Sequence, residues 1–177
     1  MKILVIKSSP HKNGASNFLA DKFIQGAKEN NHDVIVFDAG HKEIKPCIAC
    51  NVCKMKGPCV HKDTMVQLQD ILLESDMVVF ATPLYYFGMP AQLKVVIDRF
   101  YNINSKITEK NMKSALIVSA WDDVEWTLKD IKEHYLTICR YLHFDNMGII
   151  LGAGCGNLTM TQQSPYPLMA YELGKKV

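Results

Sequence analysis

The stretch ILVIKSSPHKNGASN, residues 3–17, decides the fold of this chain. Its first four residues are an uninterrupted apolar run with two isoleucines and a valine. Such a run is typical of a strand that is buried on both faces of a parallel sheet. A polar loop follows, and after Gly14 apolar residues recur at helical spacing through Lys28. We therefore predict a strand, a loop and a helix in that order.

The same alternation continues along the chain. Apolar patterns predict further strands at Val34–Phe37, Met77–Ala81, Leu116–Val118 and Met147–Leu151, and helices at Met65–Leu73, Pro90–Tyr101, Val124–Leu142 and Pro167–Lys176. Each crossover between parallel strands needs about a dozen residues, so this order predicts a doubly wound α/β sheet with helices on both faces. We expect residues 1–177 to form one domain. Its irregular stretches are Ala39–Lys62, with a cysteine-rich loop at 45–62, and Asn102–Lys113.

Composition argues against several classes of function. The formal net charge is only +2 and the lysines are scattered, so the basic patch of a nucleic-acid-binding protein is missing. The apolar run Ile3–Ile6 is too short for a signal-peptide core, and no stretch approaches the length of a membrane span. We therefore expect a cytoplasmic protein. In that reducing compartment its six cysteines indicate metal or redox chemistry more than a disulfide framework.

The loop Ser8–Asn17 is a candidate phosphate site. In open α/β sheets ligands bind beyond the carboxyl ends of the strands. This loop offers hydroxyls, amides and the free N–H groups of a helix N-terminus, and His11 or Lys12 would add charge. It matches neither the phosphate loop of nucleoside triphosphatases nor the dinucleotide fingerprint, so the phosphate of a mononucleotide fits better. A polar turn that only caps the helix is the alternative.

The loop Thr82–Pro90 contains three adjacent aromatic residues. Consecutive residues cannot all face the core, so a flat ligand such as the isoalloxazine ring of a flavin is a natural partner for them. An aromatic cover over a sheet edge, or a subunit contact, is the alternative. Trp121, in the loop after the fourth strand, would lie beside the same ligand. Asp122 and Asp123 are more simply explained as acids at a helix N-terminus.

Several motifs form a set: SPHKNG at 9–14, CIACNVC at 47–53 with Cys59, and TPLYY at 82–86 followed by QLK at 92–94 and IDR at 97–99. Together they resemble the NADPH-dependent FMN reductase and iron–sulfur flavoprotein family of flavodoxin-like proteins. The resemblance covers nearly all of the first hundred residues. His11 stands where the family usually has arginine, and Ser119–Asp123 replaces a segment that is glycine-rich in many relatives.

The resemblance implies a five-stranded sheet in the order 2-1-3-4-5 with FMN at its carboxyl edge. It also implies a homodimer or a higher homo-oligomer in which a neighbouring subunit completes the flavin site. By motif position, the residues at the FMN phosphate would be Ser9, His11, Asn13, Ser16 and Asn17. Those at the ring would be Pro83, Leu84, Tyr85, Tyr86, Phe87 and Gly88, with Ser119 and Trp121 beside them.

Cys47, Cys50, Cys53 and Cys59 lie within thirteen residues. This compact spacing suits a [4Fe–4S] cluster, whereas a structural zinc site more often uses two C-x2-C pairs that lie further apart. The spacing is that of the iron–sulfur branch of the family, but the reductase branch also has cysteines here. Metal-free thiols, zinc and disulfides therefore remain open. We expect Cys139 to be a small buried hydrophobe and Cys155 to belong to a glycine-rich turn, with a place near the flavin edge as the alternative for Cys155.

Three functions follow as expectations. The first is an FMN-dependent oxidoreductase that passes electrons from NAD(P)H through FMN to a small-molecule or redox-protein acceptor. The second is an electron carrier that combines FMN with a [4Fe–4S] cluster and a ferredoxin-like partner, and a scaffold protein that has lost its cofactor is a third. We nominate no catalytic residue, because in such proteins the cofactor performs the chemistry. NAD(P)H would dock transiently on the flavin, since the chain has no dinucleotide fingerprint.

Overall fold

A computed structural model describes the backbone of residues 1–177 and every side chain except that of Glu125. Five strands form one sheet in the order β2-β1-β3-β4-β5, and each neighbouring pair is parallel. The predicted fold class and strand order are confirmed. The strands are β1 (Lys2–Lys7), β2 (Asp33–Asp38), β3 (Met77–Pro83), β4 (Lys113–Ser119) and β5 (Asp145–Gly152).

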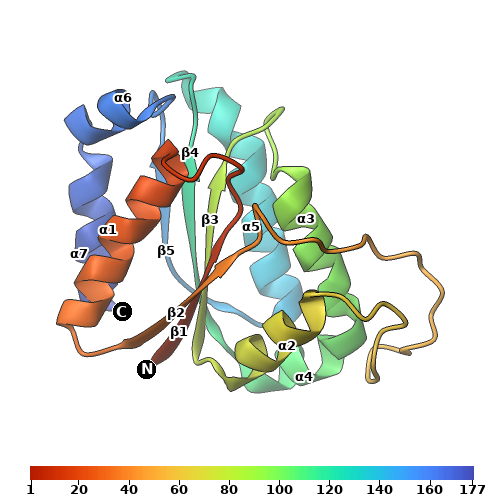
Figure 1. Cartoon of the computed structure of the whole chain (residues 1–177). Coiled ribbons are helices and arrows are strands. Elements are labelled where there is room, and N and C mark those ends of the chain that lie inside the picture. The colour runs from red at the N-terminus through yellow and green to blue at the C-terminus, as the bar shows by residue number, and fades with distance from the viewer.

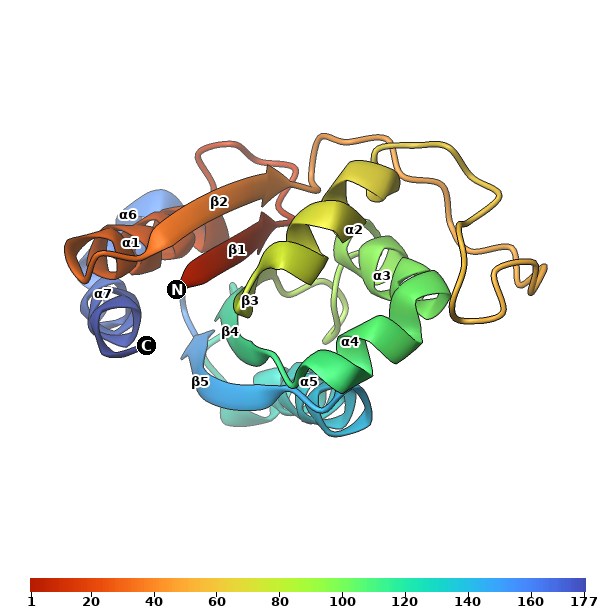
Figure 2. The same ribbon diagram turned by 90° about the horizontal axis from the view of Figure 1, so that it is seen from below.

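Helices cover both faces of the sheet. In Figures 1 and 2, α1 and α7 lie on one side of the strands, and α2, α3 and α5 lie on the other. Among the described residues no helix combines the length and the apolar character needed to cross a membrane. The helices are α1 (Ala15–Glu29), α2 (Met65–Glu74), α3 (Ala91–Asp98), α4 (Asn104–Lys110), α5 (Lys129–Leu142), α6 (Leu158–Gln163) and α7 (Tyr166–Lys176), with 3-10 turns η1 (Arg99–Ile103) and η2 (Glu125–Leu128).

The first strand shows why the sheet is buried on both sides. Ile3 and Val5 point into the cluster formed with α1 and α7, whereas Leu4 and Ile6 point into the cluster formed with α2, α3 and α5. All four side chains are inaccessible to solvent. Because every side chain of this strand has an apolar environment, an uninterrupted apolar run is the sequence that suits it.

The structure refines some predicted boundaries. The helix predicted at Pro90–Tyr101 is α3 followed by η1, and the one predicted at Val124–Leu142 starts as η2 before α5. The stretch predicted to be irregular at Asn102–Lys113 contains α4, because Ile103 and Ile107 are four residues apart and both reach the core. In contrast, Ala39–Lys62 has neither helix nor strand, as predicted.

Helices α1 and α7 are in close backbone contact at two glycines. A Cβ atom on Gly26 of α1 would lie 2.1 Å from the carbonyl oxygen of Tyr171, and a Cβ atom on Gly174 of α7 would lie 2.1 Å from that of Phe23. Real Cβ atoms do not approach a carbonyl oxygen this closely. The two helices therefore require glycine at both positions to pack as they do.

We predict that Gly26→Ala lowers the free energy of unfolding by about 1–3 kcal/mol, because overpacking forces the helices apart. Alanine is otherwise the better helix former by about 1 kcal/mol, so helix propensity alone predicts a gain in stability. Urea denaturation measures the difference. Gly88→Ala is the control: its nearest neighbouring atoms would lie 4.0 Å away, and its effect should stay within about 0.5 kcal/mol. A stabilised Gly26→Ala protein would contradict the prediction.

Candidate functional site

A cleft of about 660 Å³ opens at the carboxyl edge of the sheet. Residues from the loops after β1, β3, β4 and β5 line it. They are Ser9, His11, Lys12, Asn13, Gly14, Ala15, Ser16, Pro83, Leu84, Tyr85, Ser119, Trp121, Cys155, Gly156, Asn157 and Leu158. This is the edge where parallel α/β sheets bind ligands, and the cleft has the size of a typical small-molecule site.

One end of the cleft lies at the N-terminus of α1. No side chain caps this helix, so the N–H groups of its first turn remain available to an anion. The hydroxyl of Ser16 is buried and has no hydrogen-bond partner among the described residues. Asn17 has a different position: it does not line the cleft, and its amide donates to the carbonyl oxygens of His11 and Lys12 at 3.0 and 3.2 Å. Asn17 therefore stabilises the conformation of the loop.

The segment that follows β2 packs against the loop after β1 and holds it in place. A Cβ atom on Gly40 would lie 2.2 Å from the carbonyl oxygen of Ser9, so only glycine allows this approach. His41 bridges the two segments, with Nδ1 2.9 Å from the Asp38 carboxylate and Nε2 3.1 Å from the carbonyl oxygen of Pro10. These contacts fix the position of the Ser9 end of the cleft.

The loop after β3 forms a tight turn at the other end of the cleft. Tyr85 and Gly88 exchange backbone hydrogen bonds of 3.1 Å, and the two residues between them, Tyr86 and Phe87, both have positive φ. Such a backbone normally requires glycine or asparagine, so two aromatic residues here indicate strain that is kept at a functional surface. Tyr85 lines the cleft, whereas the side chain of Tyr86 is 99% exposed and points away from it.

The loops after β4 and β5 meet over the cleft. A Cβ atom on Gly156 would lie 2.3 Å from the indole ring of Trp121. Glycine at this position therefore leaves room for the tryptophan. Asp122 accepts a hydrogen bond of 3.0 Å from the N–H of Val124, the residue before η2, so it stabilises the turn that precedes η2 and caps none of the N–H groups within it. The sequence favoured a glycine-rich turn for Cys155 and gave a place near the flavin edge as the alternative; Cys155 lines the cleft, together with residues 156–158, which were not predicted. Their position directly after the fifth strand was the available signal.

The cleft fits FMN in two respects. The unpartnered Ser16 hydroxyl beside an uncapped helix N-terminus suits a phosphate, and the Tyr85 and Trp121 side chains offer faces for a flat ring. Of the nominated residues, four do not line this cleft: Asn17, Tyr86, Phe87 and Gly88. Phe87 instead packs against Trp126, with ring centroids 5.0 Å apart.

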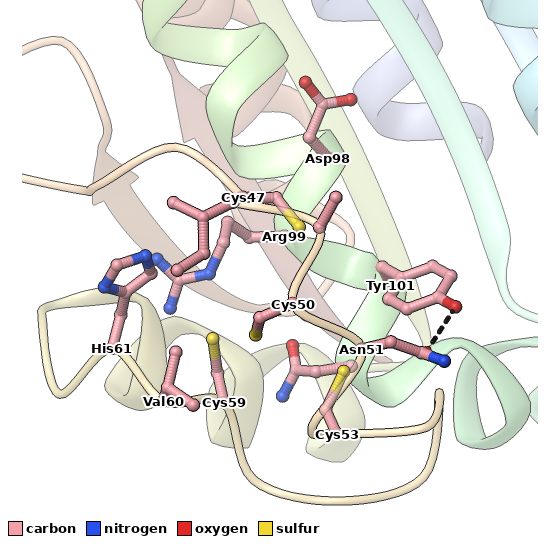
Figure 3. Close-up of a pocket in the computed structure, with 13 residues that line it drawn as sticks. Cys47, Cys50, Asn51, Cys53, Cys59, Val60, His61, Asp98, Arg99 and Tyr101 are labelled. Atoms are coloured by element: carbon pink, nitrogen blue, oxygen red, sulfur yellow. Dashed lines mark hydrogen bonds between the residues drawn. The ribbon is translucent and has the colours of Figure 1, made fainter.

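The four cysteines of the 45–62 loop line a second, much smaller cleft. Its volume is about 20 Å³, which is room for about one water molecule. Figure 3 shows the four thiols around it together with His61 and Arg99. No disulfide links any cysteines that the structure describes. Among those same residues, no three potential ligands are close enough to hold a metal ion.

A buried ion pair joins the two ends of the cysteine loop. Arg99 is 2% exposed and donates two hydrogen bonds, of 2.8 and 3.1 Å, to the carboxylate of Asp63. The same guanidinium donates to the carbonyl oxygen of Lys45 at 2.7 Å, and the N–H of Lys45 donates to Asp63 at 2.9 Å. The two ends of the cysteine loop, 18 residues apart, are thereby joined.

The segment that carries Arg99 also supports the middle of the loop. Tyr101 donates to the side chain of Asn51 at 3.0 Å, Asn102 to the carbonyl oxygen of Gly57 at 3.3 Å, and Ser105 to that of Met55 at 3.2 Å. Within the loop, four non-glycine residues have positive φ: Ala49, Asn51, Lys54 and Met55. These strained conformations persist because the 99–105 segment, which we call the loop platform, holds the loop at several points.

The donor set of the loop fits an iron–sulfur cluster in kind. Four thiols share one cleft, and residues 45–62 contain four lysines and no acidic residue, which suits an anionic centre. Two buried nitrogens at the cleft, Nε of Arg99 and Nε2 of His61, also have no hydrogen-bond partner among the described residues. The thiols are not gathered around one point, however, so a cluster requires them to move inward.

Comparison with known proteins identifies relatives of the chain. The family model described as NADPH-dependent FMN reductase matches residues 1–144. A curated iron-sulfur flavoprotein of Archaeoglobus fulgidus is 33% identical over 118 residues, which cover 67% of this chain and 54% of that protein. The chain spans about half the length of the curated relatives it matches.

Two solved structures share the fold. An NAD(P)H:quinone oxidoreductase from Methanothermobacter marburgensis has a TM-score of 0.81 at 18% identity, over 99% of this chain and 94% of that one. An FMN-dependent NADH-azoreductase from Bacillus anthracis, solved in complex with FMN, has a TM-score of 0.71 at 14% identity, over 99% of this chain and 98% of that one.

The ion pair at the base of the cysteine loop predicts a pH-dependent stability. Burial raises the pKa of the Asp63 carboxyl, but hydrogen bonds from Arg99 and from the N–H groups of Lys45 and Met65 outweigh it, so the pKa lies below its ordinary value. Asp63 therefore stabilises the fold above about pH 4, and its contribution is lost as the pH falls through the lowered pKa.

We predict that Asp63→Asn lowers the free energy of unfolding by about 3 kcal/mol at pH 7, because it leaves Arg99 buried without a counter-charge. The difference from the wild-type protein should begin to shrink below about pH 4 and should be lost as the pH falls through the lowered pKa of Asp63. Urea denaturation at several pH values measures it. Asp98→Asn, which breaks the exposed pair with Lys94, should cost no more than about 0.5 kcal/mol. Equal effects of the two substitutions would refute this account of the loop base.

Proposed function

The chain belongs to the NADPH-dependent FMN reductase family, and from this premise we propose that it binds FMN in the carboxyl-edge cleft and passes electrons from NAD(P)H through the flavin to an acceptor. The proposal rests on the different side-chain chemistry at the two ends of the cleft. An anion site at the start of α1 and aromatic faces from the loops after β3 and β4 line one continuous space. FMN has a phosphate at one end and a flat ring at the other, which matches this division.

At the phosphate end we assign binding to Ser9, His11, Asn13 and Ser16, together with the first N–H groups of α1. The positive end of the helix dipole favours a dianion, and the Ser16 hydroxyl gains the partner that it lacks. We assign Asn17 a supporting role, because its amide holds the loop carbonyls in place. Lys12, which also lines the cleft, adds positive charge.

At the ring end we assign contacts to Pro83, Leu84, Tyr85, Ser119 and Trp121. Leu84 donates its N–H to the carbonyl oxygen of Ser119 at 2.8 Å, so the two loops that would hold the ring are joined to each other. When bound, FMN supplies redox chemistry that no side chain of the protein supplies. The protein's part is to bind, to orient and to limit access, and the proposal requires no acid, base or nucleophile.

The electron donor would be NAD(P)H docked transiently on the exposed face of the ring, since the loops match no dinucleotide motif. The acceptor would be a small molecule or a redox protein that reaches the same face. We place this activity in the cytoplasm, because a reducing compartment keeps six thiols from oxidation.

We further propose that a second copy of the chain covers the flavin site. An aromatic rim beside the cleft consists of Tyr86, Phe87, Trp121 and Trp126, of which Tyr86 is 99%, Trp121 72% and Trp126 61% exposed. Exposed apolar groups in such number are typical of an interface. The strained turn that presents Tyr86 outward supports the same assignment.

A second candidate function is an electron carrier that adds a [4Fe–4S] cluster to FMN. Four cysteines at one cleft favour it, as do the curated relatives named iron-sulfur flavoprotein. Cys47, Cys50, Cys53 and Cys59 would be the ligands, and the loop platform would hold the loop at the protein surface. Here the acceptor or donor would be a ferredoxin-like protein.

The phosphate assignment predicts the effect of Ser16→Asp. The new carboxylate would lie where the phosphate binds, so FMN affinity should fall at least about tenfold, equivalent to 1.4 kcal/mol. Riboflavin, which lacks the phosphate, should bind as before. An acid in the first turn of a helix is favourable, but Ser16 is buried, so urea denaturation is used to check that the variant still folds. Fluorescence titrations with both flavins measure the effect.

Gln25→Glu is the matched control, because it adds the same charge to an exposed position of the same helix and should leave FMN affinity unchanged. If Ser16→Asp weakens the binding of FMN and riboflavin equally, the assignment of the phosphate to this loop is wrong.

On the wild-type protein, anaerobic bleaching of the flavin by NADPH and by NADH tests the activity itself. Sedimentation of the FMN-loaded chain tests the dimer.

The second candidate predicts a stoichiometric cluster. Anaerobic reconstitution with iron and sulfide should give about four irons per chain, and Cys53→Ala should lose most of them while keeping FMN. Cys155→Ala, which alters a cysteine of the flavin cleft instead, should keep all of the iron. If no iron is retained while NAD(P)H still reduces the flavin, the carrier function fails and the reductase function stands.

A further inference from the structure

His41 has a hydrogen-bond acceptor beside each of its two ring nitrogens. Nδ1 lies 3.0 and 2.9 Å from the two carboxylate oxygens of Asp38, and Nε2 lies 3.1 Å from the carbonyl oxygen of Pro10. A carboxylate and a backbone carbonyl can only accept hydrogen bonds. A neutral histidine has one N–H group and one acceptor nitrogen, so it can make only one of these contacts at a time. Only the doubly protonated, cationic ring makes both together.

The contact with Pro10 is the one that depends on the second proton. A hydrogen bond to a carboxylate is stronger than one to a neutral carbonyl, so the neutral ring keeps its proton on Nδ1, facing Asp38. An acceptor nitrogen and an acceptor oxygen then face each other at the 3.1 Å contact. The carbonyl oxygen of Pro10 accepts no other hydrogen bond from the described residues. Loss of one proton from His41 therefore detaches Pro10.

Pro10 belongs to the loop that we assign to the FMN phosphate. The next two carbonyl oxygens of this loop, those of His11 and Lys12, accept hydrogen bonds from Asn17 of α1. The carbonyl oxygen of Pro10 is instead held from another part of the chain, by His41 in the segment after β2. His41 therefore fixes the part of the loop that Asn17 does not hold.

Asp38 is the charged group in contact with His41. The other charged or titratable side chains on the segments that meet there are Lys7, His11, Lys12, Lys42 and Glu43. None of these five makes a hydrogen bond or an ion pair with His41 in the part of the chain that the structure describes. The His41 side chain is also exposed, so its proton exchanges directly with solvent, as a pH sensor requires.

We propose that His41 is a positioning residue that makes FMN binding depend on pH. The cationic ring holds the phosphate loop in its binding conformation, and loss of one proton releases the loop. This inference rests on the proposed function and adds a means of regulating the same site. The apparent affinity of a ligand falls with the fraction of molecules in the binding-competent conformation. Histidine side chains ordinarily change charge between about pH 5 and pH 8, so the contribution of His41 to FMN affinity should be lost as the pH rises through this range.

The test measures FMN affinity of the flavin-free full chain by fluorescence titration at about pH 6 and about pH 8.5. His41→Gln is uncharged and mimics the neutral ring at both pH values. We expect it to bind FMN about fivefold more weakly than the wild-type protein at the lower pH, and within about twofold of it at the higher pH. The FMN phosphate and His11 also titrate, but both are present in each protein, so their effects cancel in the ratio of affinities. His143→Asn, which removes an exposed histidine that does not line the cleft, is the control and should leave that ratio at one.

His41→Arg is the conservative variant, because a guanidinium stays charged at both pH values and has several N–H donors for Asp38 and Pro10. It should bind FMN at least about threefold more tightly than the wild-type protein at the higher pH, and about equally at the lower one. If His41→Gln does not fold, this comparison decides alone.

A purely structural contact would be lost equally at both pH values. Affinity ratios of the wild-type protein to the His41 variants that do not change with pH therefore overturn the inference, while FMN binding by the wild-type protein leaves the proposed function standing. A wild-type protein that binds no FMN at either pH overturns the proposed function and this inference together.

Discussion

The parallel pairing of strands that are buried on both faces is the constraint on which the rest of this structure depends. β1, β3 and β4 have apolar neighbours on either side, so their ladders satisfy their backbone groups and leave no room for chemistry along their length. Polar groups can gather only where the strands end. The loops after β1, β3, β4 and β5 therefore share one edge, and they line one cleft.

The same constraint places the cysteine loop. The chain leaves the sheet after β2, forms the loop, and returns through α2 to β3. Nothing within the loop gives it regular structure, so its shape comes from the platform at 99–105, which lies one short helix beyond the strained turn at Tyr85–Gly88. One continuous segment thus runs from the ring end of the flavin cleft to the support of the cysteines. Any movement of α3 would affect both places.

Of the nine described non-glycine residues with positive φ, six lie in the Tyr85–Gly88 turn and the cysteine loop, and the other three lie at the ends of α1, α4 and α5. Positive φ values at Tyr86 and Phe87 and at four residues of the cysteine loop occur beside unpaired polar atoms or exposed aromatic side chains. Elsewhere the packing is close enough to require glycine, as where α1 meets α7. A fold that is tightly determined in its core can hold unfavourable conformations at its edge, and these are the places where ligands and partners would compensate for them.

The sequence by itself determined the strands, their order and most of the helices, because hydrophobic periodicity is a local property: the run Ile3–Ile6 is typical of a doubly buried strand. It also placed the candidate loops, since each follows a strand. Only the tertiary structure decided which side chains meet. Tyr85 and Tyr86 are adjacent, yet Tyr85 lines the cleft and Tyr86 points to solvent, because the positive φ of Tyr86 turns its side chain away. The pairing of Arg99 with Asp63 joins residues 36 positions apart, and no local pattern encodes a contact over that distance.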